Sequence, residues 1–260
     1  MSINYDSRKL LQYEWSDRAD HAKKILEKHC IDVLVREFVP RGEPEPLRSL
    51  DIGSATGRYP LWFNQNGFHA VGYDISPEAV AMSRLTARGR TNIEFHVRNV
   101  LEIEPEPERF AVVTCMMGTL NHIAPDQQGR LFSWVRASLR PGGVFLFSSW
   151  NRECPYTSYL RFYTREDQEF IARNTLTADQ IVQLAVQSGF EPVGVSPLCF
   201  LTDECYDAWM GKLSESDVYA LDGYLSRLLQ PSDAQMFVTA LRRPALRREA
   251  PAPALAREAV

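Results

Sequence analysis

From about Leu47 onward the chain alternates short apolar runs with amphipathic stretches. Apolar runs bounded by turn residues are typical of buried strands, whereas apolar positions spaced by three and four are typical of helices. The alternation predicts a parallel sheet whose strands are joined by crossover helices. Strands are expected at Ser49–Ile52, His69–Tyr73, Ile93–Val97, Phe110–Met116, Val144–Ser148, Pro192–Val195 and Gln235–Leu241. Helices are expected at Pro60–Gln65, Pro77–Arg88, Asp126–Leu139 and Thr177–Gly189.

Other parts of the chain depart from this alternation. Residues 15–38 place apolar side chains between charges, as one or two amphipathic helices do. The segment PRGEPEP at 40–46 then breaks any helix, because proline lacks an amide donor and restricts the residue before it. The predicted division is an N-terminal helical cap or lid at 1–46, a main domain at 47–243 with insertions at about 150–176 and 198–233, and a tail at 244–260 too poor in apolar surface to order itself.

Composition narrows the class of function. The 260 residues include 29 Lys and Arg against 33 Asp and Glu, a formal net charge of −4. Because such a chain has no global positive field, nucleic acid is disfavoured as a partner. The start is polar and no apolar run reaches about 18 residues, so neither secretion nor membrane insertion is expected. The five cysteines lack metal-ligand spacing, which predicts no metal, free thiols and a cytoplasmic location.

The main chemical signal is the segment LDIGSATG at 50–57, a predicted strand that runs into a loop of small residues opening a helix. Small side chains let a ligand approach the backbone, and the amino end of a helix offers unpaired N–H groups. Such a loop is also compatible with a tight turn that only packs a helix on a strand. The loop alone therefore does not decide between these interpretations.

An acidic residue, Asp74, ends the second predicted strand and adds a second signal. A carboxylate there can accept hydrogen bonds from both hydroxyls of a ribose, so the two signals together indicate an adenosine-type ligand. Gly53, Ala55 and Gly57 are spaced one residue more tightly than G-x-G-x-x-G, which disfavours a nicotinamide oxidoreductase. Asp51 would repel a pyrophosphate, but it can help to hold a cationic amino-acid group directly or through water.

On these residues the sequence resembles the class I, Rossmann-like, S-adenosylmethionine-dependent methyltransferases over about residues 47–241. The resemblance implies a doubly wound α/β fold: a mostly parallel seven-stranded sheet with an antiparallel last strand, helices on both faces and an N-terminal helical cap. It also implies S-adenosylmethionine as the cofactor and S-adenosylhomocysteine as the product. The cofactor-binding residues that it implies are Asp51, Gly53, Ser54, Ala55, Gly57, Asp74, Ile75, Asn99, Val100, Met116 and Met117.

By the same resemblance, Ile75 packs on the adenine and Asn99 lies at its edge. Two positions depart from the family pattern. Ala55 replaces a common glycine, which is tolerable if the φ of Ala55 is negative. Asn99 replaces a common aspartate, and its amide can still accept a hydrogen bond from the adenine amino group. The segment LRPGG at 139–143 matches a family turn that precedes the fifth strand.

The acceptor side of the site carries weaker signals. Methyl transfer requires the acceptor to be aligned about 3 Å from the methyl group and water to be excluded, and a base is needed only for a protonated acceptor. His122 titrates near neutrality, so it is the expected base or acceptor-orienting group; alternatively, its ring only bonds the loop backbone. Substrate contacts are expected from Tyr13, Asn121, His122, Trp150 and Tyr156. The alternative is that Asn121 caps a turn and that the aromatic side chains only bury the insertions.

The sequence thus predicts an enzyme that methylates nitrogen or oxygen of a small-molecule acceptor, with specialised metabolism as one setting. A tRNA or protein methyltransferase and a non-catalytic S-adenosylmethionine-binding subunit remain as alternatives. The acceptor and the oligomeric state are not predicted.

Overall fold

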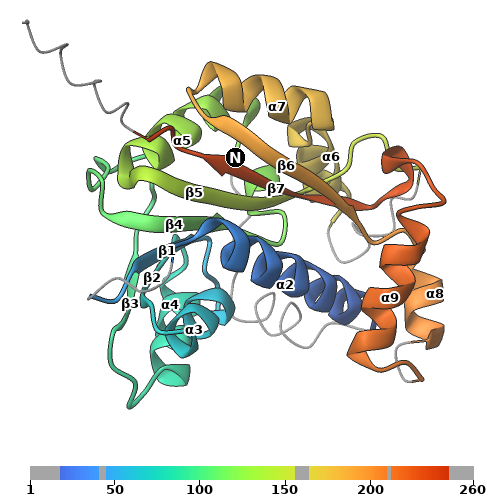
Figure 1. The fold of residues 1–260 in the computed structure, drawn as a ribbon, viewed down its shortest axis with the longest axis horizontal. Coiled ribbons are helices and arrows are strands. Elements are labelled where there is room, and N and C mark those ends of the chain that lie inside the picture. The colour runs from blue at the N-terminus through green and yellow to red at the C-terminus, as the bar shows by residue number, and fades with distance from the viewer. Residues whose placement is uncertain (1–17, 41–44, 156–163, 210–211, 246–260) are drawn as a thin grey trace, which may run out of the picture.

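The computed structural model describes residues 18–40, 45–155, 164–209 and 212–245. A seven-stranded sheet with the order β3-β2-β1-β4-β5-β7-β6 forms its centre (Figure 1). The strands are β1 (Arg48–Ile52), β2 (His69–Asp74), β3 (Ile93–Val97), β4 (Phe110–Cys115), β5 (Leu139–Trp150), β6 (Glu191–Leu198) and β7 (Met236–Arg242). β7 runs antiparallel to both of its neighbours, and the other pairs are parallel. The predicted fold class is confirmed.

Helices cover both faces of the sheet (Figure 1). The predicted crossovers are present as α3 (Arg58–Gln65), α4 (Pro77–Thr86), α5 (Pro125–Ser138) and α7 (Ala178–Gln187), while α2 (Arg18–Phe38) precedes the sheet. The remaining helices are α6 (Arg165–Asn174), α8 (Asp203–Trp209) and α9 (Glu215–Leu225), with short 3-10 turns η1 (Thr119–His122) and η3 (Pro231–Asp233). No helix in these described ranges is long and apolar enough to cross a bilayer.

An apolar core lies on each face of the sheet. On one face, Phe132 of α5 makes edge-to-face contacts with Phe145 and Phe147 of β5. On the other face, Ile31 and Val35 of α2 are fully buried in a cluster that also contains side chains of α3, β4, β5 and β7. The carboxyl-terminal half of α2 therefore shares the core of the sheet, and its position fixes where the rest of the helix lies.

β5 begins earlier than predicted, and the turn expected at 140–143 is part of the strand. Gly142 N donates to Arg243 O at 3.0 Å, and Arg243 N donates to Gly143 O at 2.9 Å, which extends the pairing with the end of β7. The β4–β5 register shifts between Phe110 and Val112, so an irregularity in pairing takes the place of the turn.

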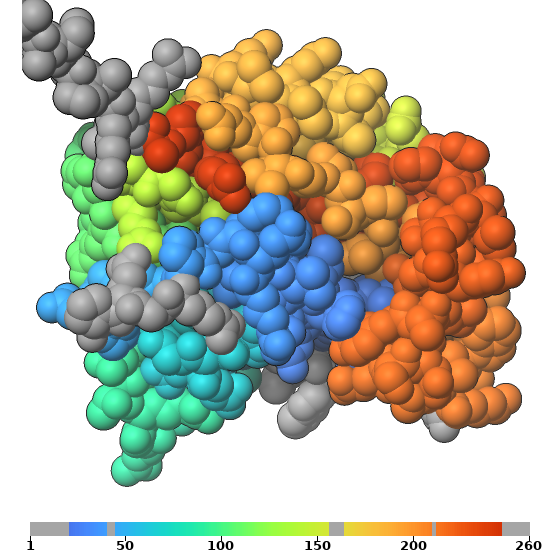
Figure 2. Space-filling model, in the orientation of Figure 1, coloured from blue at the N-terminus to red at the C-terminus, as the bar shows by residue number. Residues whose placement is uncertain are grey.

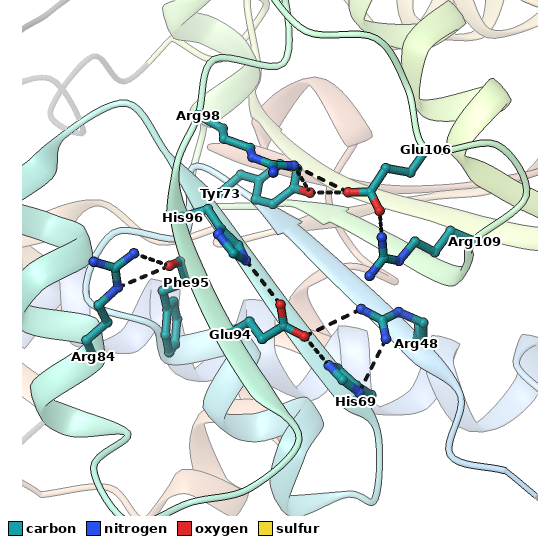
Figure 3. Close-up of polar contacts among 10 residues, drawn as sticks. All are labelled: Arg48, His69, Tyr73, Arg84, Glu94, Phe95, His96, Arg98, Glu106 and Arg109. Carbon is teal, nitrogen blue, oxygen red and sulfur yellow. Dashed lines mark hydrogen bonds and ion pairs between the residues drawn. The ribbon is translucent and has the colours of Figure 1, made fainter.

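Residues 98–109 join β3 to β4 without a helix, and the neighbouring sheet face carries polar side chains (Figure 3). The Glu94 carboxylate lies between two histidines, 2.5 Å from His69 Nε2 and 3.2 Å from His96 Nε2. At the margin of the sheet, the Arg84 guanidinium donates to Phe95 O of β3 at 3.1 and 2.7 Å. A polar network thus lies on the β3 side of this face, next to the apolar core that contains Val71 and Tyr73.

Candidate active site

The loop between β1 and α3 bends from β1 onto the end of β2. Gly53 N and Ser54 N both donate to Tyr73 O, at 2.8 and 3.0 Å. The φ of Gly53 is +73°, and a Cβ on this residue would lie 2.5 Å from the Thr119 methyl carbon. Glycine is required here because the backbone is left-handed and because η1 packs directly on the loop. Gly57, also predicted as a site residue, precedes α3, and its N–H donates to Ser54 O at 2.8 Å.

Asp74 joins this loop to β2. Its Oδ2 accepts the backbone N–H of Ala55 at 2.8 Å, and its Oδ1 accepts that of Ser76 at 2.9 Å. The backbone of Ile75 is also hydrogen-bonded to this carboxylate. Because a carboxylate has about four acceptor sites, one remains for a further donor such as a ribose hydroxyl. Burial raises the pKa of Asp74, and the backbone donors oppose that rise.

Ala55 itself differs from expectation. Its φ is +44°, so the negative φ under which alanine would replace glycine without strain is absent. A left-handed conformation costs a residue with a Cβ about 1–2 kcal/mol. The hydrogen bond from Ala55 N to Asp74 supports this conformation.

Asp51 lies at the end of β1 and is buried. Thr114 Oγ1 of β4 donates to its Oδ1 at 2.7 Å. Burial raises the pKa of Asp51 to about 8, the negative charges of Glu27 and Asp74 add to the rise, and Arg58 opposes it. A cation beside Asp51 would stabilise the ionised carboxylate, as expected for a residue near a cationic amino-acid group.

The turn after β4 is left-handed at two successive residues. The φ of Met117 is +51° and that of Gly118 is +72°. A Cβ at Gly118 would lie 2.6 Å from Trp150 Nε1. Met117 N donates to Glu27 Oε1 at 2.8 Å, and Gly118 N donates to Ser148 Oγ at 3.2 Å. Side chains from α2 and β5 therefore hold both backbone amides of the turn.

Sequence reasoning missed Glu27. The signal available was its place on the buried side of the amphipathic helix, four residues before Ile31. Both side chains are fully buried in the structure. Met116, which was predicted as a cofactor contact, is also buried, in the core that contains Ile31 and Val35.

Asn121 and His122 lie in η1, beside this turn. The Asn121 side chain accepts Trp150 N at 3.0 Å and donates to Thr175 Oγ1 at 3.1 Å, and its carbonyl accepts Asn174 Nδ2 at 3.1 Å. Asn121 thus links η1 to β5 and to the end of α6. Burial lowers the pKa of His122 to about 4, so its ring is neutral at pH 7. Of the other predicted substrate contacts, Trp150 is buried, and Tyr13 and Tyr156 lie outside the described residues.

Three further predicted cofactor-binding residues, Ile75, Asn99 and Val100, differ in exposure and in hydrogen bonding. Ile75 is 52% exposed beside Asp74, which leaves its side chain open to a planar ring. Asn99 Oδ1 accepts Leu101 N at 3.1 Å, and its Nδ2 donates to Glu102 Oε1 at 2.8 Å, so this amide already closes a turn. Val100 is buried in the core, which limits its possible contact with a ligand to the backbone.

These residues fit S-adenosylmethionine. Asp51 and Asp74 match a cationic amino acid and a ribose, while the Ser54 hydroxyl is buried and has no hydrogen-bond partner within the described part of the chain. A buried hydroxyl without a partner is rare unless a ligand or water supplies one. In the same part of the chain, no group of three or more His, Cys, Asp or Glu side chains could hold a metal ion. The five cysteines are free thiols.

A methyltransferase domain model matches residues 22–195, which is more than half of the chain. The chain belongs to the methyltransferase domain family. The relatives it matches include the ubiquinone biosynthesis O-methyltransferase of Bradyrhizobium sp. (strain ORS 278), with 33% identity over 107 residues, 41% of each chain. The protein of the same name from Aromatoleum aromaticum is 28% identical over 168 residues, 62% of this chain and 68% of the relative. The chain thus spans about two fifths of the first relative and about two thirds of the second.

Solved structures share the fold. The PH0226 protein of Pyrococcus horikoshii aligns with a TM-score of 0.60 and 17% identity over 92% of this methyltransferase and 100% of that chain. Phosphoethanolamine N-methyltransferase 2 of Haemonchus contortus, solved with S-adenosyl-L-methionine, aligns with a TM-score of 0.62 and 20% identity over 92% of this chain and 58% of that one. The methyltransferase domain family and the shared fold agree with the resemblance of the sequence to class I, S-adenosylmethionine-dependent methyltransferases.

Proposed function

We propose that the protein transfers the methyl group of S-adenosylmethionine to an oxygen or nitrogen atom of a small organic acceptor. The observation that carries this proposal is the junction at Asp74, whose carboxylate holds the β1–α3 loop and keeps an acceptor site for a ribose hydroxyl. The names of the relatives support an oxygen acceptor, and that of the Haemonchus contortus protein supports a nitrogen acceptor.

The residues of this chain have separate tasks in the proposed reaction. Bound S-adenosylmethionine supplies a methyl group that is already activated by a sulfonium. In this proposal Asp74 orients the ribose, and Asp51 binds the amino-acid end as an anion. Because the methyl group needs no further activation, the protein contributes alignment and the exclusion of water. We assign the turn at Met117 and Gly118 to the place where the two substrates meet, because this turn packs through Thr119 on the β1–α3 loop.

The acceptor would be held by elements beyond the ends of the parallel strands. α2 lies beside α8 and α9 there, and Figure 2 shows α2 on the surface between α3 on one side and α8 and α9 on the other. Lys23 of α2 pairs with Asp203 of α8 at 2.7 Å, and both side chains are buried. This covering favours an organic molecule over a macromolecule, and the net charge of −4 disfavours nucleic acid.

His122 is proposed to accept a hydrogen bond or a proton from the acceptor. Because burial lowers its pKa to about 4, the imidazole is neutral at physiological pH, and one nitrogen of a neutral imidazole is a hydrogen-bond acceptor. A group with so low a pKa is a weak base. The proposed role of His122 is therefore to orient a methyl acceptor whose own proton is acidic.

The test is a binding measurement followed by turnover. Calorimetry with S-adenosylmethionine should detect a complex. Labelled S-adenosylmethionine is then incubated with a panel of alcohols, phenols and amines and with a metabolite extract, and S-adenosylhomocysteine is measured by mass spectrometry. We expect acceptor-dependent formation of S-adenosylhomocysteine. Binding without turnover on any acceptor would support a non-catalytic subunit instead, and absence of binding would overturn the proposal.

A further inference from the structure

Glu27 is a fully buried carboxylate to which three elements of the fold donate. Its Oε1 accepts Met117 N at 2.8 Å, and its Oε2 accepts the hydroxyl of Tyr59 in α3. The Ser148 hydroxyl of β5 is also bonded to the carboxylate. Burial raises the pKa of Glu27, and these donors oppose that rise. Leaving a charged group in the interior is costly unless it is well bonded, so this arrangement is demanding on the fold.

Glu27 is linked to both residues of the turn after β4. Met117 N donates to Glu27 directly, and Gly118 N donates to Ser148, whose hydroxyl is hydrogen-bonded to Glu27. Both residues of the turn are left-handed, and Met117 has a Cβ, so the turn requires support from its surroundings. Glu27 and Ser148, which are hydrogen-bonded to each other, provide that support.

The turn after β4 also contacts the loop between β1 and α3 (residues 53–57, the cofactor loop). Thr119 N and Oγ1 donate to Met116 O at 3.1 and 2.7 Å, which fixes the threonine against the turn. The same threonine packs on Gly53 so closely that no Cβ would fit between them. Glu27 is therefore linked through Met117 and Thr119 to the loop that follows β1.

We infer that Glu27 is a positioning residue, which holds the Met117–Gly118 turn and, through Thr119, the cofactor loop in the geometry that binds S-adenosylmethionine. The inference rests on the proposed function, because the proposed function assigns the turn to the place where cofactor and methyl acceptor meet. Glu27 acts through hydrogen bonds to the turn and not through contact with the cofactor, since all of its side-chain surface is buried.

The experiment compares variants that keep or remove the hydrogen bonds. In Glu27→Gln the amide oxygen can still accept Met117 N, and the amide N–H groups can donate to the hydroxyls of Tyr59 and Ser148. Glu27→Ala removes all three bonds. Glu37→Gln, on the exposed side of the same helix, is the matched control. For each folded variant of the full chain, S-adenosylmethionine affinity is measured by calorimetry, and amide exchange is followed at Met117 and Gly118.

We expect Glu27→Ala to weaken S-adenosylmethionine binding at least about 10-fold and to speed exchange at the two amides, the scale set by losing several buried hydrogen bonds. Glu27→Gln should stay within about 3-fold of the wild type, and the control should match it. A loss in Glu27→Gln as large as that in Glu27→Ala would overturn the inference, because it would indicate that the charge is needed. Normal affinity in folded Glu27→Ala would overturn it as well.

If Glu27→Ala does not fold, Ser148→Ala carries the test, because it removes the acceptor of Gly118 N and leaves Glu27 in place. We expect a loss of about 3-fold in affinity and faster exchange at Gly118. Unchanged affinity and exchange would contradict the inference. A wild-type protein that binds no S-adenosylmethionine would instead refute the proposed function, so the two failures are distinguishable.

Discussion

The carboxylate of Asp74 accepts the backbone N–H of Ala55 at 2.8 Å, so the residue that ends β2 also fixes the loop that leaves β1. Its other oxygen accepts Ser76 N at the start of α4. A side chain predicted to bind a ribose thus also sets the shape of the loop around it. Its removal is expected to affect the cofactor site in both ways.

Replacing Asp74 should weaken cofactor binding strongly. Asp74→Ala removes the acceptors for Ala55 N and for the proposed ribose hydroxyl, so we expect a loss of about 1.5–3 kcal/mol, or roughly 10- to 150-fold in the Kd for S-adenosylmethionine. Calorimetry measures this change, and Glu191→Ala on the exposed edge strand β6 serves as the control. A folded Asp74→Ala protein with unchanged affinity would contradict the ribose assignment.

Replacing Ala55 with glycine should stabilise the protein. The φ of Ala55 is +44°, a region in which glycine avoids the cost of a Cβ. The gain is partly offset because glycine is more flexible in the unfolded chain, which leaves about 0.5–1 kcal/mol. Urea unfolding of Ala55→Gly should show this increase in the free energy of unfolding, with Ala87→Gly, whose φ of −86° brings no such relief, as the destabilised comparison. A decrease in Ala55→Gly would show that the strain is absent.

Asp51 should make cofactor binding depend on pH. Its pKa is about 8 in the protein without cofactor, and a neighbouring cation lowers it, so binding should release a proton. The affinity for S-adenosylmethionine is therefore expected to rise with pH and to level off above about pH 8. Calorimetry in buffers of different ionisation enthalpy counts the released protons, and Asp51→Asn should abolish that release. Equal proton release in both proteins would assign it to another group.

The Asp51 carboxyl group should also make the stability of the protein without cofactor depend on pH. The free energy of unfolding is expected to fall with rising pH, whereas the cofactor affinity rises. Because the pKa of Asp51 is raised from 3.8 to about 8 on folding, the folded state holds a proton that the unfolded state loses between those values. The contribution is complete below about pH 4 and disappears as the pH rises through about 8. Thermal unfolding without cofactor should show a smaller decline across this range for Asp51→Asn than for the wild type.

His122→Ala should slow the chemical step without a matching loss of cofactor affinity. The His122 pKa of about 4 also predicts that single-turnover rates stay flat from about pH 5 upward, because the ring is already neutral. Rapid-quench measurements with an identified acceptor test both expectations. A normal rate in the variant would exclude a catalytic role and leave the ring as a structural element of η1.

The buried pair of Lys23 and Asp203 should be sensitive to the loss of one partner. Lys23→Met leaves the Asp203 carboxylate buried, bonded at 3.3 Å to Gln235 Nε2, and we expect it to cost about 3–5 kcal/mol. The double variant Lys23→Met with Asp203→Leu should recover most of that loss, because it removes both buried charges. Chemical unfolding provides the measurement, and a double variant as unstable as the single one would disagree.

The sheet and its crossovers were predictable because the patterns that specify them are local. The capping box of Thr177 and Gln180 before α7, for example, is contained within four residues. The helix α6 was missed, although Thr164, which accepts Asp167 N, precedes an acidic first turn that is also a local signal. The antiparallel direction of β7 came from the family resemblance and not from its own residues.

The supports of the site were not predictable in the same way. Glu27 and Met117 are 90 positions apart, and Asn121 and Thr175 are 54 apart, so no local pattern reports either contact. The positive φ of Ala55 also depends on a distant group, since the bond that supports it comes from Asp74. The sequence predicted residues around a cofactor, whereas the partners that hold these residues became visible only in the folded chain.

The pair of hydrogen bonds from Arg84 to Phe95 O affects whether β3, at the edge of the sheet, can pair with a strand of another molecule (Figure 3). An outermost strand offers its backbone as a template on which another chain can grow. On β3, a guanidinium already occupies one of those carbonyls, and a charged carboxylate stands beside it at Glu94. The β3 edge is consequently a poor template for β-aggregation, and high protein concentration should not cause strand pairing between molecules at this edge.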